Sequence, residues 1–219
     1  MQMQKDLELK HDVEAELEWD PEIDARKIGV ESAGGVVTLL GHVRSYYEKW
    51  NAEGVAKRVH GVKAIANDLE VQLLSDDHRD DSDIAQSALT ALEWNSAIPR
   101  DRVRVIVTKG FVTLDGEVEW QYQKNAALDA VRNLRGVKGV NNQISVSPHL
   151  YAGDVKAKIE AALKRSAEID SKQVVVETSD GSVTLRGKVR SWVERQDAVN
   201  AAWSAPGVKK VVDHLAISV

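Results

Sequence analysis

Hydrophobic and polar residues alternate along the chain with two distinct periods. Leu9, Val13 and Leu17 are four residues apart, which is the spacing of the buried stripe of an amphipathic helix. Further along, Val37 and Leu39 fall in the period-2 pattern of a strand that buries one face. Both patterns return twice, as helical stripes at Ile84, Ala88, Leu92 and at Val155, Ile159, Leu163, and as strands at Val112, Leu114, Val118 and at Val183, Leu185, Val189.

Short sequence matches place three copies of one unit in register. The segment 35–41 reads Gly-Val-Val-Thr-Leu-Leu-Gly, and close variants of it occupy 110–116 and 181–187, which lie 75 and then 71 residues further on. Twenty residues after the last glycine of each segment comes Gly-Val-Lys, at 61–63, 136–138 and 207–209. Several matches that share one register indicate an internal triplication.

Each copy is predicted to fold as helix, strand, strand, helix, strand. Asp180-Gly181 is a hairpin signal between the first two strands, and Ser45 with Glu48 forms a capping box that begins the second helix. The second strand, the second helix and the last strand form a crossover, so these two strands should be parallel. The predicted fold class is therefore α+β, with three tandem αββαβ domains, each having two helices packed on one face of a three-stranded mixed sheet.

The repeat also predicts the domain boundaries. We expect domain 1 at 1–74, an acidic linker at 75–82, domain 2 at 83–147 and domain 3 at 148–219. A domain of about 70 residues is close to the lower limit for an independent hydrophobic core, so packing among the three copies would add stability.

The αββαβ order, the Gly-x-Val-Thr-Leu-x-Gly strand and the Gly-Val-Lys turn resemble the BON (bacterial OsmY and nodulation) domain, and the resemblance covers the whole chain as three tandem copies. It implies a non-enzymatic, transport-associated bacterial module that binds phospholipid or a protein partner and acts in osmotic stress. It also implies export, since most such proteins are exported. The motifs are structural, so no catalytic residues are carried over.

Catalytic and metal-binding patterns are missing from the sequence. Cysteine is absent, which excludes disulfides and thiolate chemistry, and no phosphate-binding loop, nucleophile elbow or zinc-protease motif occurs. Of the six histidines only His78 and His149 share a repeat offset, and both fall in expected linkers. We therefore expect no enzyme activity, no metal and no cofactor.

The second helices carry aromatic residues on a face that should be polar. At about 100° per residue, their core faces are predicted to hold Ala52 and Val55, Ala127 and Ala130, and Ala198 and Ala201. An outward apolar stripe marks an interface, within the chain, in a homo-oligomer, with a partner protein or at a membrane. The candidate interface residues are Tyr46, Trp50, Trp192, Val199 and Trp203.

Charge is distributed unevenly over the copies. The chain has 29 basic and 34 acidic residues, with a net charge of −5, and the first domain alone carries that net charge while the third is positive. On the second strand of domain 3, Arg186, Lys188 and Arg190 occupy the register opposite to the buried one, so they should share the uncovered sheet face. This basic sheet face is the candidate contact for an anion or a lipid headgroup.

Together these features predict a binding or adaptor protein that contacts phospholipid or a protein partner through aromatic helix faces and a basic sheet face. The alternative is a nucleic-acid-binding protein that uses the open sheet faces. The polar outward residues Thr38, Thr113 and Asp115 disfavour this alternative, because base stacking needs exposed aromatic side chains. The acidic first twenty residues contain no apolar run, and no transmembrane segment is visible. We therefore expect a cytoplasmic location, or a periplasmic one if a leader has been removed.

Overall fold

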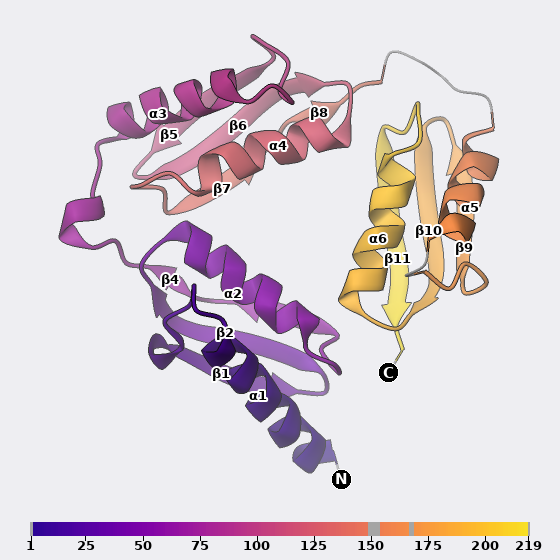
Figure 1. Ribbon diagram of the computed structural model, residues 1–219, viewed down its shortest axis with the longest axis horizontal. Helices are drawn as coiled ribbons and strands as arrows, with labels where there is room; N and C mark the ends of the chain where they lie inside the picture. Colours follow the sequence, from indigo (N-terminus) through magenta and orange to yellow (C-terminus); the bar gives the residue numbers. More distant parts are fainter. Residues whose placement is uncertain (1, 149–153, 167–168, 219) are drawn as a thin grey trace.

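The computed structural model describes residues 2–148, 154–166 and 169–218, and it confirms the α+β class with three repeats of the α-β-β-α-β unit (Figure 1). In domain 1, β2 pairs antiparallel with β1 and parallel with β3, so α2 is the crossover between parallel strands. Its elements are α1 (Gln2–Trp19), a 3-10 turn (Ala25–Lys27), β1 (Ile28–Ala33), β2 (Val36–Val43), α2 (Tyr46–Arg58), β3 (Ala64–Asn67) and β4 (Glu70–Val71).

Domain 2 repeats this topology after a 3-10 turn (Ser75–Asp77) in the connecting segment. Helix α3 begins at Asp81, inside the stretch expected to be linker. The Asp81 carboxylate accepts hydrogen bonds from the N–H groups of Lys109 and Gly110 at 2.7 and 2.8 Å. The elements are α3 (Asp81–Trp94), β5 (Val103–Thr108), β6 (Phe111–Val118), α4 (Gln121–Arg132), β7 (Gly139–Asn142) and β8 (Ser145–Val146).

Domain 3 differs in its last strand, which is continuous. In domains 1 and 2 that strand is broken after Asn67 and Asn142, whose side-chain amides donate to the carbonyls of Lys49 and Lys124 at 3.2 and 3.0 Å. The matched residue in domain 3 is Asp213, which instead pairs with Arg195 at 2.7 Å. The elements are α5 (Val155–Arg165), β9 (Val174–Ser179), β10 (Ser182–Val189), α6 (Trp192–Trp203) and β11 (Lys210–Ile217).

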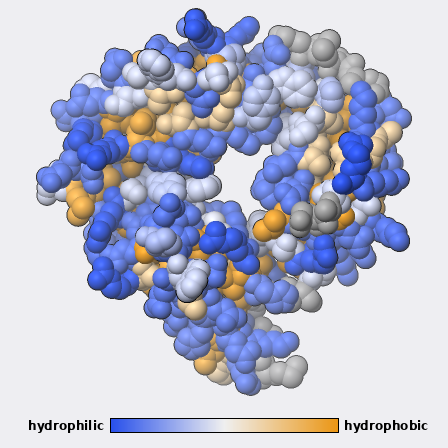
Figure 2. Space-filling model, viewed as in Figure 1, coloured by the Kyte–Doolittle hydropathy of each residue, from blue (hydrophilic) through white to orange (hydrophobic). Residues whose placement is uncertain are grey.

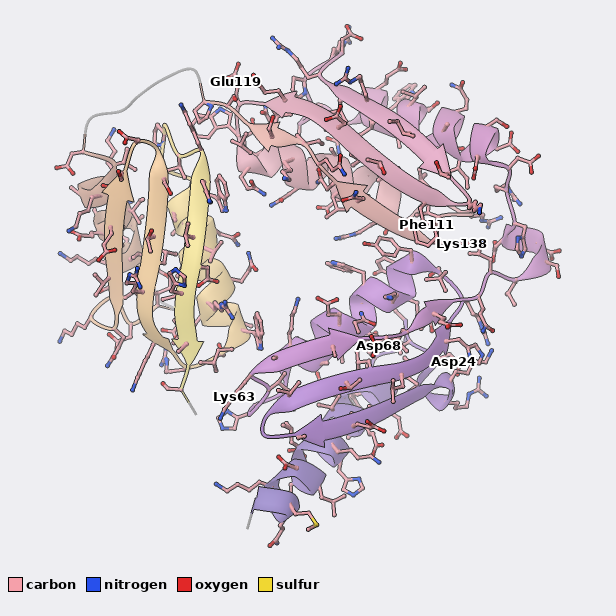
Figure 3. The ribbon with its side chains drawn as sticks, turned by 180° about the vertical axis from the view of Figure 1, so that it is seen from behind. Asp24, Lys63, Asp68, Phe111, Glu119 and Lys138 are labelled. Atoms are coloured by element: carbon pink, nitrogen blue, oxygen red, sulfur yellow. The ribbon has the colours of Figure 1, made fainter. Side chains whose placement is uncertain are left out.

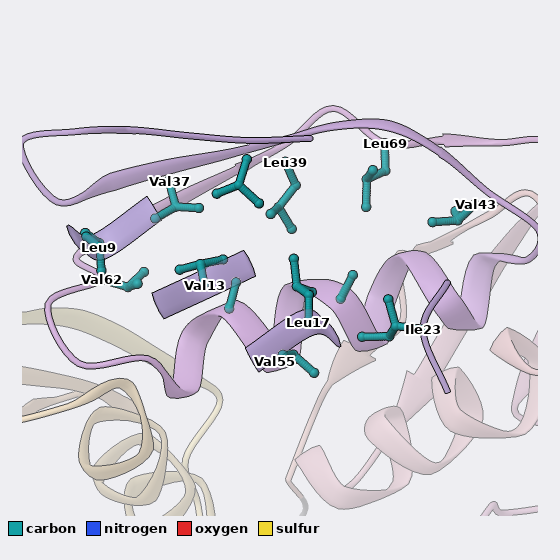
Figure 4. Packing of buried hydrophobic residues seen from close by; sticks show 13 residues of the cluster. Leu9, Val13, Leu17, Ile23, Val37, Leu39, Val43, Val55, Val62 and Leu69 are labelled. Carbon is teal, nitrogen blue, oxygen red and sulfur yellow. The ribbon is translucent and has the colours of Figure 1, made fainter. Parts of the chain in front are cut away.

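Each domain has a separate hydrophobic core between its helix pair and its sheet. In domain 1 the predicted stripe of Leu9, Val13 and Leu17 packs against Val37 and Leu39 (Figure 4). In the second helices of domains 2 and 3, the predicted core residues Ala127 and Ala198 are fully buried, but the next predicted position is displaced by one residue. Val131 and Ala202 are fully buried there, while Ala130 and Ala201 are half-buried.

The three sheets lie on one side of the molecule and the helices on the other. Figure 1 shows the helices in front, and the view from behind shows the strands in front (Figure 3). The second helices α2, α4 and α6 are turned toward the middle, and an opening remains between the domains in the space-filling view (Figure 2). In the described part of the chain, no helix combines the length and the hydrophobicity that spanning a membrane requires.

One glycine in each central strand is required by the backbone. Gly41, Gly116 and Gly187 have φ of 111°, 144° and 128°, and a Cβ there would overlap the carbonyl oxygen of the residue before the first strand. We expect Gly187→Ala to lower the free energy of unfolding by roughly 2–4 kcal/mol, since strain and overlap add. Urea denaturation measures the change.

Gly54→Ala is the matched control. Gly54 lies within helix α2, and a Cβ there would meet nothing within 4 Å. We expect this variant to gain up to about 1 kcal/mol from helix propensity. A Gly187→Ala protein as stable as the native chain would contradict the backbone constraint.

Candidate functional site

Buried carboxylates fix the start of the second helix in two domains. The Glu48 carboxylate accepts the backbone N–H groups of Asp24 and Arg44, both at 2.8 Å. In domain 3 the Glu194 carboxylate accepts those of Asp170 at 2.8 Å and Arg190 at 2.6 Å. Each helix therefore begins at a fixed point beside the loop that precedes the first strand, and this positions the aromatic residues of its first turns.

Helix α4 of domain 2 uses an uncharged version of this contact. The side-chain oxygen of Gln123 accepts the backbone N–H groups of Glu119 and Trp120, both at 3.0 Å. The sequence lacks a serine cap at Trp120, and the backbone N–H of Gln123 donates instead to the carbonyl of Trp120 at 3.1 Å.

Domains 1 and 2 meet at the first turns of α2. Tyr46 packs against the core of domain 2 and shares a hydrogen bond with the backbone of Val140. Burial of this phenol raises its pKa, and the Val140 hydrogen bond opposes the rise only in part. Trp50 lies one turn further on, and the guanidinium carbon of Arg132 is 3.5 Å from the centroid of its ring. The side chain of Arg132 is 15% exposed, so this cation–π contact is largely shielded from water.

Domains 1 and 3 meet where α2 and α6 contact each other. Trp192 belongs to domain 3 but packs against the core of domain 1. The Nζ atom of Lys57 lies 5.5 Å from its ring centroid, and the guanidinium carbon of Arg195 lies 4.8 Å from it. Its indole nitrogen is buried and has no hydrogen-bond partner among the described residues.

The two other members of the predicted stripe lie elsewhere. Val199 and Trp203 are half-buried and pack against the core of their own domain. The structure therefore brings together Tyr46, Trp50 and Trp192 around helix α2, and does not bring Val199 and Trp203 to the same junction. Trp192 is the first residue of α6 and Trp203 is the last, so the contact with domain 1 is made at the beginning of this helix.

The basic sheet face of domain 3 is partly neutralised. Arg186 and Lys188 are exposed on the side of the sheet away from the helices. The Arg186 guanidinium pairs with Glu177 at 3.3 Å across β9 and β10. Arg190 extends past the end of β10 and pairs with the buried Glu194 at 3.2 Å.

Two exposed tryptophans were not among the predicted site residues. Trp19 and Trp94 end helices α1 and α3, at positions that match in the repeat, and their exposed fractions are 83% and 85%. Each follows a buried leucine, Leu17 or Leu92, by two residues, so each points away from the helical stripe. That offset is visible in the sequence and could have identified them.

The surroundings of these two tryptophans differ. Trp94 lines a groove of about 940 Å³ with apolar residues that include Leu89, Ile98 and Pro99, and the charged residues there are Glu93, Arg100 and Asp101. Trp19 instead lines a shallow hollow with Asp12, Glu16, Arg58 and His60. The matched helix ends thus differ in the shape and the apolar content of the surface beside the tryptophan.

Comparison with known proteins identifies the family. The BON domain model matches residues 5–72, 80–148 and 152–218, so the chain belongs to the BON family as a tandem protein of three domains. Proteins of this kind are generally non-enzymatic. Within the described ranges, no cluster of three or more possible metal ligands occurs.

Two curated bacterial proteins are similar to this chain. Osmotically-inducible protein Y of Escherichia coli is 33% identical over 144 residues, which cover 62% of this chain and 72% of that protein. Outer membrane lipoprotein DolP of Haemophilus influenzae is 32% identical over 138 residues, which cover 62% and 71%. These relatives give no support to the expected cytoplasmic location.

Solved structures resemble the chain only weakly. CdsD, a structural protein of the type III secretion system of Chlamydia trachomatis, has a TM-score of 0.27 at 16% identity, covering 96% of this chain and 92% of that one. The PrgH periplasmic domain has a TM-score of 0.22 at 11% identity, with coverages of 88% and 96%.

The buried Glu194 predicts a specific pH dependence. Burial raises the pKa of this carboxyl, but the hydrogen bonds from Arg190 and Asp170 outweigh burial, so its net pKa is lowered. A lowered folded-state pKa stabilises the protein above the ordinary carboxyl pKa of about 4.3, and this contribution is lost as the pH falls through the folded-state value. Urea denaturation at pH 7 and at pH 4 measures the loss.

Glu194→Gln should cost roughly 1–3 kcal/mol at pH 7, since one N–H group loses its charged acceptor. It should also have a smaller loss of stability between pH 7 and pH 4 than the native protein. Glu177→Gln removes the same charge from an exposed position and should change both quantities little. Equal pH dependence in the Glu194→Gln protein and the native protein would contradict this role of Glu194.

Proposed function

We propose that this protein is a non-enzymatic adaptor that binds anionic phospholipid at the Trp94 surface and acts in the cell envelope during osmotic stress. The Trp94 surface consists of Leu89, Trp94, Ile98, Pro99 and Arg100. The observation that carries the proposal is the almost complete exposure of Trp94 beside a groove whose walls include the apolar side chains of Leu89, Ile98 and Pro99. Tryptophan favours the boundary between headgroups and acyl chains, where its ring is partly apolar and its N–H group stays hydrated.

One basic side chain beside Trp94 could contact an anionic headgroup. Arg100 lines the groove together with Glu93 and Asp101, and Arg102 follows two residues later. Each basic residue close to an anionic bilayer contributes about 1 kcal/mol to binding. The position in domain 1 that matches Arg100 is Ala25, so the same surface in domain 1 lacks this basic contact.

The two curated relatives support the envelope location and the osmotic-stress role in this proposal. One is named for its osmotic induction and the other as an outer membrane lipoprotein. We extend both properties to this chain, and propose an envelope location in place of the cytoplasmic one.

The other predicted surfaces receive roles consistent with their contacts. We infer that Tyr46, Trp50 and Trp192 form the internal interface that holds the three domains together. The basic sheet face, with Arg186 and Lys188, is proposed as a second contact for an anionic ligand, on the opposite side of the molecule from the helices.

Binding of a protein partner through the Trp94 surface is the competing interpretation. A nucleic-acid interface is disfavoured. Phe111 is exposed on the open sheet of domain 2, but Asp115 and Glu117 extend from the same face.

Flotation with vesicles that contain phosphatidylglycerol tests the lipid proposal. We expect Trp94→Ser to weaken binding about tenfold or more, because burial of a large apolar side chain contributes roughly 1.5–3 kcal/mol. Arg100→Gln should weaken binding less, and vesicles of phosphatidylcholine alone should bind poorly.

Trp19→Ser is the matched control, since it removes the same side chain from the same exposed position of the repeat. We expect it to change binding less than twofold. An equal loss in both variants would mean that exposed indoles act without specificity. If the Arg186→Gln, Lys188→Gln double variant abolishes binding while Trp94→Ser does not, the lipid contact is the sheet face and the Trp94 assignment is wrong.

The internal interface makes a separate prediction. Trp192→Ala should release domain 3 from domain 1, and the radius of gyration measured by small-angle X-ray scattering should increase. The circular dichroism of the folded domains should remain, because Trp192 is not part of the core of its own domain. An unchanged radius of gyration, or the unfolding of domain 3, would contradict this role of Trp192.

A further inference from the structure

A second pocket lies at the junction of domains 1 and 2, separate from the Trp94 surface. It has a volume of about 370 Å³, and both domains contribute to its walls. Domain 1 provides the start of α2, and domain 2 provides the end of α4 and the turn that follows. Its walls include Arg44, Tyr47, Leu73, Arg132, Leu134 and Arg135.

The side chains around this junction pocket give it a positive charge. Three arginines line it, and Asp77 is the one carboxylate among the described lining residues. Arg44 pairs with Asp24 and Arg132 with Asp129, each at 2.8 Å, and both of these carboxylates lie outside the pocket. Arg135 is 3.8 Å from Asp77, too long for a good hydrogen bond.

A guanidinium group has five N–H donors, so pairing with one carboxylate leaves some of these donors available to a ligand. In Arg132 the Nε atom is buried and has no hydrogen-bond partner in the described part of the chain. The same guanidinium lies on the ring of Trp50, which holds it in place before any ligand arrives. A donor group that is already fixed loses little freedom on binding, and this favours recognition.

The main chain at this place favours cations rather than anions. Helix α4 ends at Arg132, so its last turn presents carbonyl groups and the negative end of its dipole. An anion here must therefore be held by the arginine side chains, whose planar fork matches phosphate oxygens.

We propose that the junction pocket binds a phosphate monoester with a small apolar group. The phosphate would lie among Arg44, Arg132 and Arg135, and the apolar group against Leu73, Leu134 and Val137. Since Arg44 belongs to domain 1 and the two other arginines to domain 2, the ligand bridges the domains and fixes their junction. The same phosphate chemistry is available from a free metabolite and from a lipid headgroup.

Titration of the full chain with hexyl phosphate, followed by isothermal calorimetry and by the NMR signals of arginine Nε–H groups, tests the site. We expect saturable binding, with inorganic phosphate binding more weakly and hexanol not at all. Arg135→Gln and Arg44→Gln should each weaken hexyl phosphate about tenfold, since each removes a charged donor. Arg132 is left in place because it packs on Trp50.

Arg104→Gln removes the same charge from an exposed strand position, where Arg104 pairs with Asp115 at 2.6 Å. This control should bind hexyl phosphate within twofold of the native protein. Absence of saturable binding, or an equal loss in the control, would overturn the proposal.

Vesicle flotation of the same variants identifies the source of the phosphate. The vesicles contain phosphatidic acid, whose headgroup is a phosphate monoester. If Arg44→Gln and Arg135→Gln bind hexyl phosphate weakly but these vesicles normally, the ligand is a soluble phosphate and the Trp94 surface binds lipid independently. If the two variants lose hexyl phosphate binding and vesicle binding together, the pocket receives a lipid headgroup. Trp94→Ser should leave hexyl phosphate binding unchanged in either case, so failure of the pocket and failure of the Trp94 surface can be distinguished.

Discussion

The structure depends on the burial of one face of a small sheet by only two helices. A unit of this size can cover one side of its three or four short strands, and its core consists of about a dozen apolar side chains. The limited core leaves the second helix with a face that the unit itself does not cover. In domain 1 that face meets both neighbouring domains, through Trp50 and through the contact with Trp192. Contacts between domains therefore follow from the small size of the repeat, and α2 is at their centre.

Repetition made the fold predictable from the sequence. The Gly-x-Val-Thr-Leu-x-Gly strand combines a hairpin, a buried period-2 register and a glycine whose backbone no other residue tolerates, and it occurs three times in one register. Local signals of this kind determine local structure. The broken last strand was not predicted, because it depends on Asn67 and Asn142 reaching the carbonyls of the preceding helix. That contact forms only when the helix packs on the sheet.

The candidate site was predictable only in part, for a related reason. Helical periodicity indicates that Trp192 lies outside the core of its own domain, but it does not indicate which neighbouring domain covers this side chain. Val199 and Trp203 were grouped with it by an angular step of 100° per residue, but both pack against the core of their own domain, because helical phase does not show which part of a helix meets a neighbour. The convergence of Arg44 and Arg135 requires a domain junction, and no spacing along one chain encodes such a meeting. Trp94, by contrast, could have been found from its offset to Leu92 alone.

The segregation of sheets and helices to opposite sides has a consequence for assembly (Figure 3). A flat target can lie against the strands or against the helices, but it cannot lie against both. Two different targets can therefore be held at the same time, one on each side, without competing for the same residues. Two layers held in this way would be separated by the thickness of one helix layer packed on one sheet.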